Sequence, residues 1–146
     1  MKNDSMTPEV LENRLVDFAV RIGKVADALP DTRLGQHIAN QIVRSGTSPA
    51  PNYSEGCAAE SRKDFAHKLS ISLKELRETK TWLRIIRKAD LLPAQRLHAI
   101  VDEADQRMNR IAGHEDLPKP QDALQRELDL SEKNREEGPV KEPLSE

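Results

Sequence analysis

The chain has 146 residues, of which 36% are hydrophobic and 33% charged, so it fits one globular domain and leaves no room for a second sizeable core. Only 3% of the residues are aromatic and six are glycine, which favours an all-α fold over a β-sandwich or barrel. No apolar run is long enough for a membrane span or a signal peptide, so a cytoplasmic protein is expected. The formal net charge of -2 conceals an asymmetry, because residues 1–112 carry 18 Lys and Arg against 15 Asp and Glu, whereas residues 113–146 carry 5 against 10.

The first two helices are predicted from apolar residues spaced three and four positions apart. Thr7 and Pro8 are typical of a helix start, since threonine accepts from free backbone N–H groups and proline fits the first turn. Pro30 ends this helix, and Asp31 or Thr32 can cap the next one. The apolar positions of the first helix are Leu11, Leu15, Phe18, Ala19, Ile22, Val25, Ala26 and Leu29, and those of the second are Leu34, Ile38, Ala39, Ile42 and Val43.

A break is predicted over residues 45–51, because two prolines within three residues cannot supply the N–H groups that a regular helix needs. Helix resumes at Asn52 and fades by Ala59. We interpret Asn52 and Glu55 as structural residues that satisfy backbone groups orphaned by the prolines. A catalytic role is less well supported, because no second acid or base lies near Glu55 in the sequence.

Two further helices complete the predicted fold. Ser61, with Asp64 three residues later, resembles a capping box and opens a helix over residues 62–88, which is roughly 40 Å long at 1.5 Å per residue. The apolar positions of this helix, all expected to face the core, are Phe65, Leu69, Leu73, Leu76, Leu83 and Ile86. Pro93 starts the last helix and Gly113 ends it. Short connections between four helices predict an antiparallel, up-down-up-down bundle over residues 1–112.

Residues 113–146 are predicted to form an acidic, mostly disordered tail. They contain four prolines and few branched apolar side chains, so burial cannot offset the entropy lost on ordering. Leu124, Leu128 and Leu130 have near-helical spacing, which leaves two alternatives open: a solvated linker, or a helix that forms on a partner.

No constellation for catalysis or for metal binding is found. The four histidines are scattered, and only His67 has an acid, Asp64, three residues upstream, whereas a di-iron bundle needs two Glu-x-x-His pairs and two further glutamates. The single cysteine, Cys57, excludes an intrachain disulfide and is expected to be buried and inert among small alanines. Neither Gly46 nor Gly56 belongs to a phosphate-binding loop. The sequence therefore predicts no enzymatic activity, no metal and no cofactor.

The charge pattern of the 62–88 helix is its most informative feature. Nine basic residues stand against Asp64, Glu75 and Glu78. Six of the bases recur three and four positions apart, which places them on one side of the helix beside the apolar seam. We call these six the basic flank: Lys74, Arg77, Lys80, Arg84, Arg87 and Lys88. Such a surface binds phosphates without reading a base sequence, and the alternative is a solvated face that acids of adjacent helices or of the tail neutralise.

An ordered motif surrounds the predicted break. It has the pattern Arg-x-x-Thr-Ser, then Asn-x-x-Glu-Gly, then Ser-x-x-Asp-Phe at the start of the next helix, and its members are Arg44, Thr47, Ser48, Asn52, Glu55, Gly56, Ser61, Asp64 and Phe65. Through this series the chain resembles the bacterial four-helix-bundle family known as 23S rRNA-intervening-sequence proteins, over roughly residues 12–112. The two prolines around Ala50 and the basic Lys68 and Lys74 depart from the family's commoner small or apolar choices, and the acidic tail lies outside the resemblance.

The resemblance implies a bundle that assembles into a ring, typically a homopentamer, with no established enzymatic activity. The family is also distantly similar to the accessory variability protein of diversity-generating retroelements, a pentameric bundle that engages nucleic acid and a reverse transcriptase. We therefore expect a non-enzymatic homo-oligomer that binds nucleic acid, in the first place RNA, through the basic flank. The alternative is a protein-interaction scaffold or adaptor, such as an accessory subunit of a reverse transcriptase, without direct nucleic-acid contact.

Overall fold

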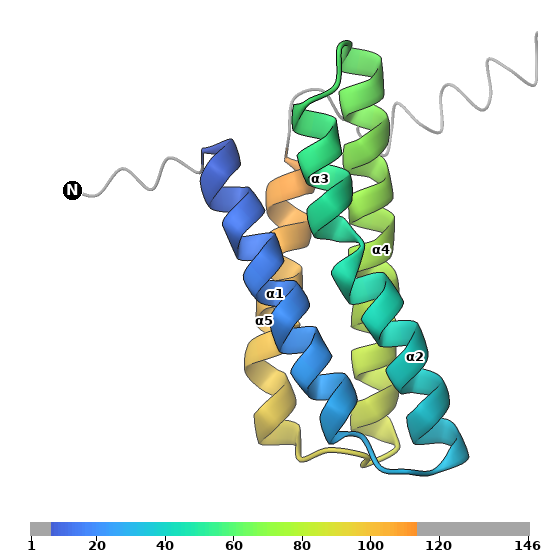
Figure 1. Ribbon diagram of the computed structural model, residues 1–146. Helices are drawn as coiled ribbons and strands as arrows, with labels where there is room; N and C mark the ends of the chain where they lie inside the picture. Colours follow the sequence, from blue (N-terminus) through green and yellow to red (C-terminus); the bar gives the residue numbers. More distant parts are fainter. Residues whose placement is uncertain (1–6, 114–146) are drawn as a thin grey trace, which may run out of the picture.

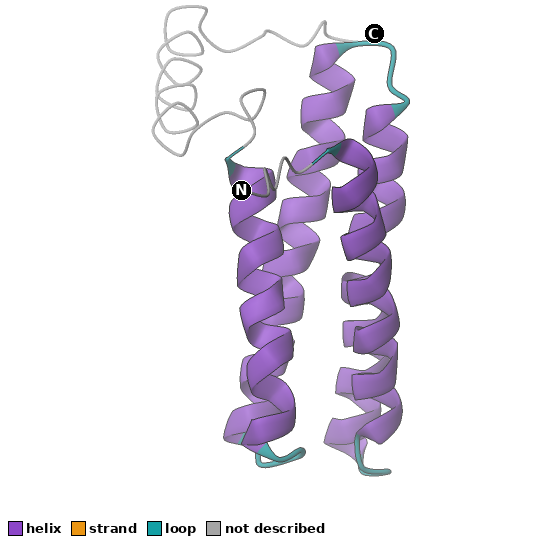
Figure 2. Cartoon of the chain, turned by 90° about the vertical axis from the view of Figure 1, so that its left-hand side faces the viewer, coloured by secondary structure: helices purple, strands orange, loops and turns teal. Residues whose placement is uncertain are grey.

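The computed structural model describes residues 7–113, and within this range the chain is all-α without a β-strand. The residues before Thr7 and the acidic tail after Gly113 lie outside the described residues. Five helical segments follow one another: α1 (Pro8–Ala28), α2 (Arg33–Thr47), α3 (Pro49–Cys57), α4 (Arg62–Lys88) and α5 (Ala94–Ala112). Short loops at the two ends of the bundle join α1 to α2, α3 to α4 and α4 to α5 (Figure 2), whereas only Ser48 separates α2 from α3.

Hydroxyl side chains cap three of the helix starts, as the sequence predicts. Thr7 Oγ1 accepts from the Val10 N–H at 3.3 Å, and Ser61 Oγ accepts from the Asp64 N–H at 3.1 Å. Of the two residues that could cap α2, Thr32 does so, since its Oγ1 accepts from the Gly35 N–H at 3.1 Å. Each of these bonds satisfies a backbone donor that has no partner inside its helix.

The predicted break between α2 and α3 is much narrower than residues 45–51. Helix continues to Thr47 and begins again at Pro49, and even Ser48 keeps helical dihedral angles, with φ -72° and ψ -35°. The two prolines fall in the first turn of α3, where N–H groups have no intrahelical acceptor and proline costs little. The prediction that helix resumes only at Asn52 was therefore wrong by three residues.

The five segments form a four-helix bundle, because α2 and α3 follow one another as a single interrupted rod (Figure 1). The connections α1–α2 and α4–α5 lie at one end of this bundle, and the α3–α4 connection lies at the other (Figure 1). Helix α4 packs against α2, α3 and α5, and so does α1, whereas no Cα atom of α1 lies within 8 Å of a Cα atom of α4. These two helices therefore occupy diagonal positions, and their outer faces point in opposite directions.

One continuous core runs along the bundle axis. Its fully buried large side chains are Leu15, Phe18, Ile22, Ile38, Ile42, Leu69, Leu76, Leu83, Ile86, Leu97, Ile100 and Ile111. The nine of them that lie before α5 were predicted from the spacing of apolar residues. Phe65 was expected in the core but is only half-buried, because it lies in the first turn of α4, at the edge of the bundle. No helix in the range 7–113 has both the length and the apolar character needed to cross a membrane.

Candidate nucleic-acid interface

The basic flank lies on α4, mostly on its exposed side. Five of its six members are exposed, and within residues 7–113 these five form no ion pair: Lys74, Arg77, Arg84, Arg87 and Lys88. Lys80 differs, because it is half-buried and its Nζ lies 2.5 Å from Asp105 Oδ1 on α5. The structure therefore leaves most of the flank's positive charge uncancelled by described carboxylates.

The seam between α4 and the α2–α3 rod determines which side of α4 faces outward. Ser72 Oγ donates to the Pro49 carbonyl at 3.1 Å, and Thr79 Oγ1 lies 2.9 Å from Ser45 Oγ and 2.8 Å from the Glu75 carbonyl oxygen. Ser45, Ser72 and Thr79 are completely buried. Their small side chains let the two rods approach closely, and their hydroxyls are paired, so the burial carries no uncompensated cost.

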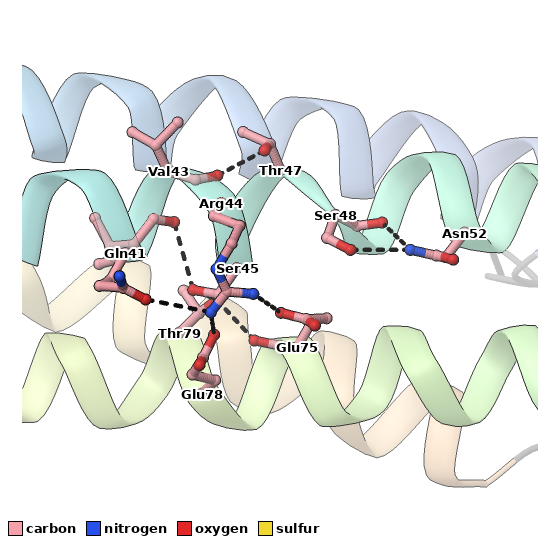
Figure 3. A network of polar contacts seen from close by, with 11 residues as sticks. Gln41, Val43, Arg44, Ser45, Thr47, Ser48, Asn52, Glu75, Glu78 and Thr79 are labelled. Atoms are coloured by element: carbon pink, nitrogen blue, oxygen red, sulfur yellow. Dashed lines mark hydrogen bonds and ion pairs between the residues drawn. The ribbon is translucent and has the colours of Figure 1, made fainter.

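The acids in the middle of α4 are already engaged by α2. Arg44 Nη1 lies 3.2 Å from Glu75 Oε2, and Arg44 Nη2 pairs with Glu78 Oε2 (Figure 3). The hydrogen bond that Arg44 donates to Glu78, together with the charge of both glutamates, raises the pKa of Arg44 above its usual range. Because these two carboxylates are paired with α2, the basic flank is not neutralised by its own helix.

Two surface hollows adjoin the basic flank near the C-terminal end of α4. A shallow one of about 490 Å³ is lined by Thr81, Arg84, Ile85, Lys88 and Ala89. A second, of about 280 Å³, lies between α4 and α5, and its lining residues are Arg87, Ala94, Gln95, Leu97, His98, Val101 and Asp102. Both hollows combine basic groups with apolar side chains.

The motif residues are spread along the α2–α3 rod and the start of α4. Arg44 and Thr47 lie on α2, Ser48 lies at the α2–α3 junction, and the members from Glu55 to Phe65 surround the α3–α4 connection. Asn52 Nδ2 donates to the carbonyl and hydroxyl oxygens of Ser48, each at 2.9 Å (Figure 3). A Cβ atom on Gly56 would lie 3.0 Å from Lys68 Cβ, so this glycine lets α3 and α4 pack closely. Glu55 Oε2 accepts from Lys68 Nζ at 2.6 Å on the surface.

Cys57 does not match its prediction, because its side chain is exposed. It ends α3 and faces a cleft of about 550 Å³ that Pro8, Glu9 and Phe65 also line. The neighbouring alanines that favoured burial, Ala58 and Ala59, follow the last residue of α3 and do not cover the thiol. Within residues 7–113 no group of three or more potential metal ligands converges.

Arg107 is a residue that the sequence analysis missed. It is 4% exposed, and its Nε and Nη1 atoms have no hydrogen-bond partner within the described part of the chain. Burial, reinforced by the charge of nearby Arg14, lowers the pKa of its guanidinium. The charge of nearby Glu103 opposes this shift, but its carboxylate is paired with Arg21. A signal was available, because position 107 continues the buried series 97, 100, 104 and 111.

Comparisons with known proteins agree with this architecture. The family model of the 23S rRNA-intervening sequence proteins matches residues 11–113. The chain is similar to the crystal structure of a protein of unknown function from the S23 ribosomal protein family of Bacteroides thetaiotaomicron, with 31% sequence identity and a TM-score of 0.66. That similarity covers 70% of this chain and 94% of the other. No curated protein matches the chain.

The family model spans the whole bundle, from the first turn of α1 to the end of α5, and so includes both the motif residues and the basic flank. The solved relative has the same fold over nearly its entire length. The chain therefore belongs to the 23S rRNA-intervening sequence protein family.

Proposed function

We propose that this protein is a non-enzymatic, homo-oligomeric bundle that binds RNA through the basic flank of α4. The observation that supports the proposal is the set of five exposed cations without an ion pair among residues 7–113. Between Lys74 and Lys88 they follow α4 for about 21 Å at 1.5 Å per residue. Polyanion binding releases condensed counterions, so unpaired cations in a row contribute to affinity regardless of base sequence.

The same mechanism gives the expected dependence of affinity on salt. Neutralising about five phosphates of a single strand gives a slope of roughly -3.5 in log K against log salt, so affinity falls about 100-fold between 50 and 200 mM salt. Aromatic residues are too sparse on this surface for base stacking, so little discrimination between base sequences is expected.

We also propose that the up-down-up-down bundle assembles into a homopentameric ring through the faces of α1 and α2. Exposed valines support this: Val16 and Val20 on α1 are 47% and 55% exposed, and Val43 on α2 is 40% exposed. Large apolar side chains gathered on one face are typical of a surface that a partner covers. Because α1 and α4 are diagonal, subunits that meet through α1 leave the basic flank free for RNA.

Charge reversal on the flank tests RNA binding. The double variant Arg77→Glu/Arg84→Glu is expected to lose binding of a fluorescein-labelled single-stranded RNA in anisotropy titrations at 50 mM salt. The matched control, Arg96→Glu/Arg110→Glu, makes the same change in net charge at exposed positions of α5, outside both the basic flank and the proposed subunit interface. Light scattering should report the same oligomer for both variants. Equal RNA affinity in the two double variants would place the binding surface elsewhere.

A further inference from the structure

The acidic segment after Gly113 complements the basic flank in charge. Residues 114–146 contain ten acidic and five basic residues. The bundle, by contrast, presents five cations in a row without an ion pair in the described range. The whole chain is nearly neutral only because these two parts offset one another.

The edge between α4 and α5 already shows how a carboxylate engages this flank. Asp105 on α5 approaches Lys80 to 2.5 Å, in the middle of the flank. Carboxylates placed further along the same edge would meet Arg84, Arg87 and Lys88, each of which is exposed. An acidic segment that lies alongside α4 can therefore form ion pairs with several cations in addition to Lys80.

The hollows beside the flank suit the apolar residues of the same segment. Between acidic positions it carries five leucines: Leu117, Leu124, Leu128, Leu130 and Leu144. The hollow between α4 and α5 is lined by Leu97 and Val101 next to Arg87, although the carboxylate of Asp102 lies there as well. A segment that contains both acids and leucines, which alternate over residues 127–130, matches a surface that combines cations with apolar hollows.

The length of chain is sufficient for this contact. Segment 114–146 starts where α5 ends, and α5 packs along α4. Thirty-three residues span at most about 110 Å when extended, whereas α4 is roughly 40 Å long. A tethered ligand reaches an effective concentration of order millimolar, so weak individual ion pairs are enough for occupancy.

We propose that residues 114–146 bind the basic flank of their own chain, with carboxylates against its cations and leucines in the adjoining hollows. The contact itself is independent of RNA. Its consequence, competition with RNA for the same cations, rests on the proposed function. Salt weakens both interactions, because both are electrostatic.

Zero-length crosslinking tests the contact directly on the full-length protein. A carbodiimide joins a carboxylate to a lysine amine that touches it, and mass spectrometry identifies the linked peptides. We expect residues 114–146 to crosslink to Lys74 and Lys88 at 50 mM salt, and these crosslinks to fall at least fivefold in 1 M salt. Lys68 with Glu55 is the positive control, and the exposed Lys24 on α1 is the negative control.

Mixing equal amounts of unlabelled and nitrogen-15-labelled protein distinguishes contacts within a chain from those between chains. Crosslinks within one chain support the proposal. Crosslinks found only between chains, crosslinks to Lys24 as abundant as those to Lys74 and Lys88, or no crosslinks from the segment to the flank would each overturn it.

A second variant tests the consequence for RNA. Replacing the ten acidic residues of 114–146 by Asn and Gln keeps the length of the segment and is expected to tighten RNA binding about tenfold at 50 mM salt. Unchanged RNA affinity in this variant, with the crosslinks present in the wild type, would reject competition while keeping the contact. Absence of RNA binding in both proteins would reject the proposed function and leave the crosslinking result standing.

Discussion

Replacing Arg107 by methionine is expected to stabilise the protein. The guanidinium lies in the core stripe of α5, and only its Nη2 atom donates a hydrogen bond within residues 7–113, to Gln106 Oε1 at 3.2 Å. The positive charge of Arg14 further disfavours the charged form of the Arg107 guanidinium. Each buried donor without a partner costs about 1–3 kcal/mol, and a charged group costs more.

Methionine keeps the unbranched stem of the side chain and removes the unpaired donors. Some packing around the guanidinium is lost, so the net gain is smaller than the sum of these penalties, and we expect about 2 kcal/mol of added stability. For a domain of this size that corresponds to a rise of roughly 10 °C in the unfolding midpoint.

Urea denaturation at a fixed protomer concentration measures the effect, because assembly makes apparent stability depend on concentration. The midpoint should rise at constant m-value. Arg110→Met, at an exposed position of the same helix, is the control and should change stability by less than about 0.5 kcal/mol. If Arg107→Met lowers stability by more than about 1 kcal/mol, the guanidinium is not an uncompensated charge and the reasoning fails.

Two further predictions concern packing and titration. Gly46→Ala should destabilise the protein by about 1–3 kcal/mol, because the new Cβ atom would lie 2.5 Å from Ile22 Cγ2. Gly23→Ala should instead stabilise it by about 0.5–1 kcal/mol, because a Cβ atom at position 23 would have no other atom within 4 Å. Thermal melts measure both effects. Burial of Tyr53 raises the pKa of its phenol above the usual value of about 10. The contribution of the neutral, buried phenol to the free energy of unfolding is fully present at neutral pH and is lost as pH rises above 10, because the unfolded state then loses the proton more readily. Phenolate absorbance at 295 nm should therefore appear only together with unfolding. Phenolate formation at pH 10 with intact helical circular dichroism would contradict that.

The helices were predictable from the sequence because their signals are local. Thr7, Thr32 and Ser61 each precede an apolar repeat and cap the helix that follows. The break was overestimated because a proline in the first turn of a new helix and a proline within a helix look alike in sequence. Which of the two applies at Pro49 depends on the backbone angles of Ser48, which are helical in the structure.

The candidate site was predictable only in part. Helical periodicity placed the basic flank on one side of α4, and the structure shows five of its cations exposed. Two sets of ion pairs depend on which helices are neighbours. Lys80 pairs with Asp105 on α5, and Arg44 on α2 pairs with Glu75 and Glu78. Such distant pairings leave no periodic signal in the chain.

The buried hydroxyls between α2 and α4 fix the register of these helices. Aliphatic side chains would tolerate a slide of one helical turn, because one hydrocarbon surface is much like another. Here a slide of about 5.4 Å would separate Thr79 from Ser45 and Ser72 from the Pro49 carbonyl, and so would break both of these buried hydrogen bonds between the rods. The seam thus favours a single alignment of the two rods, and this alignment keeps every cation of α4 at a constant height along the bundle.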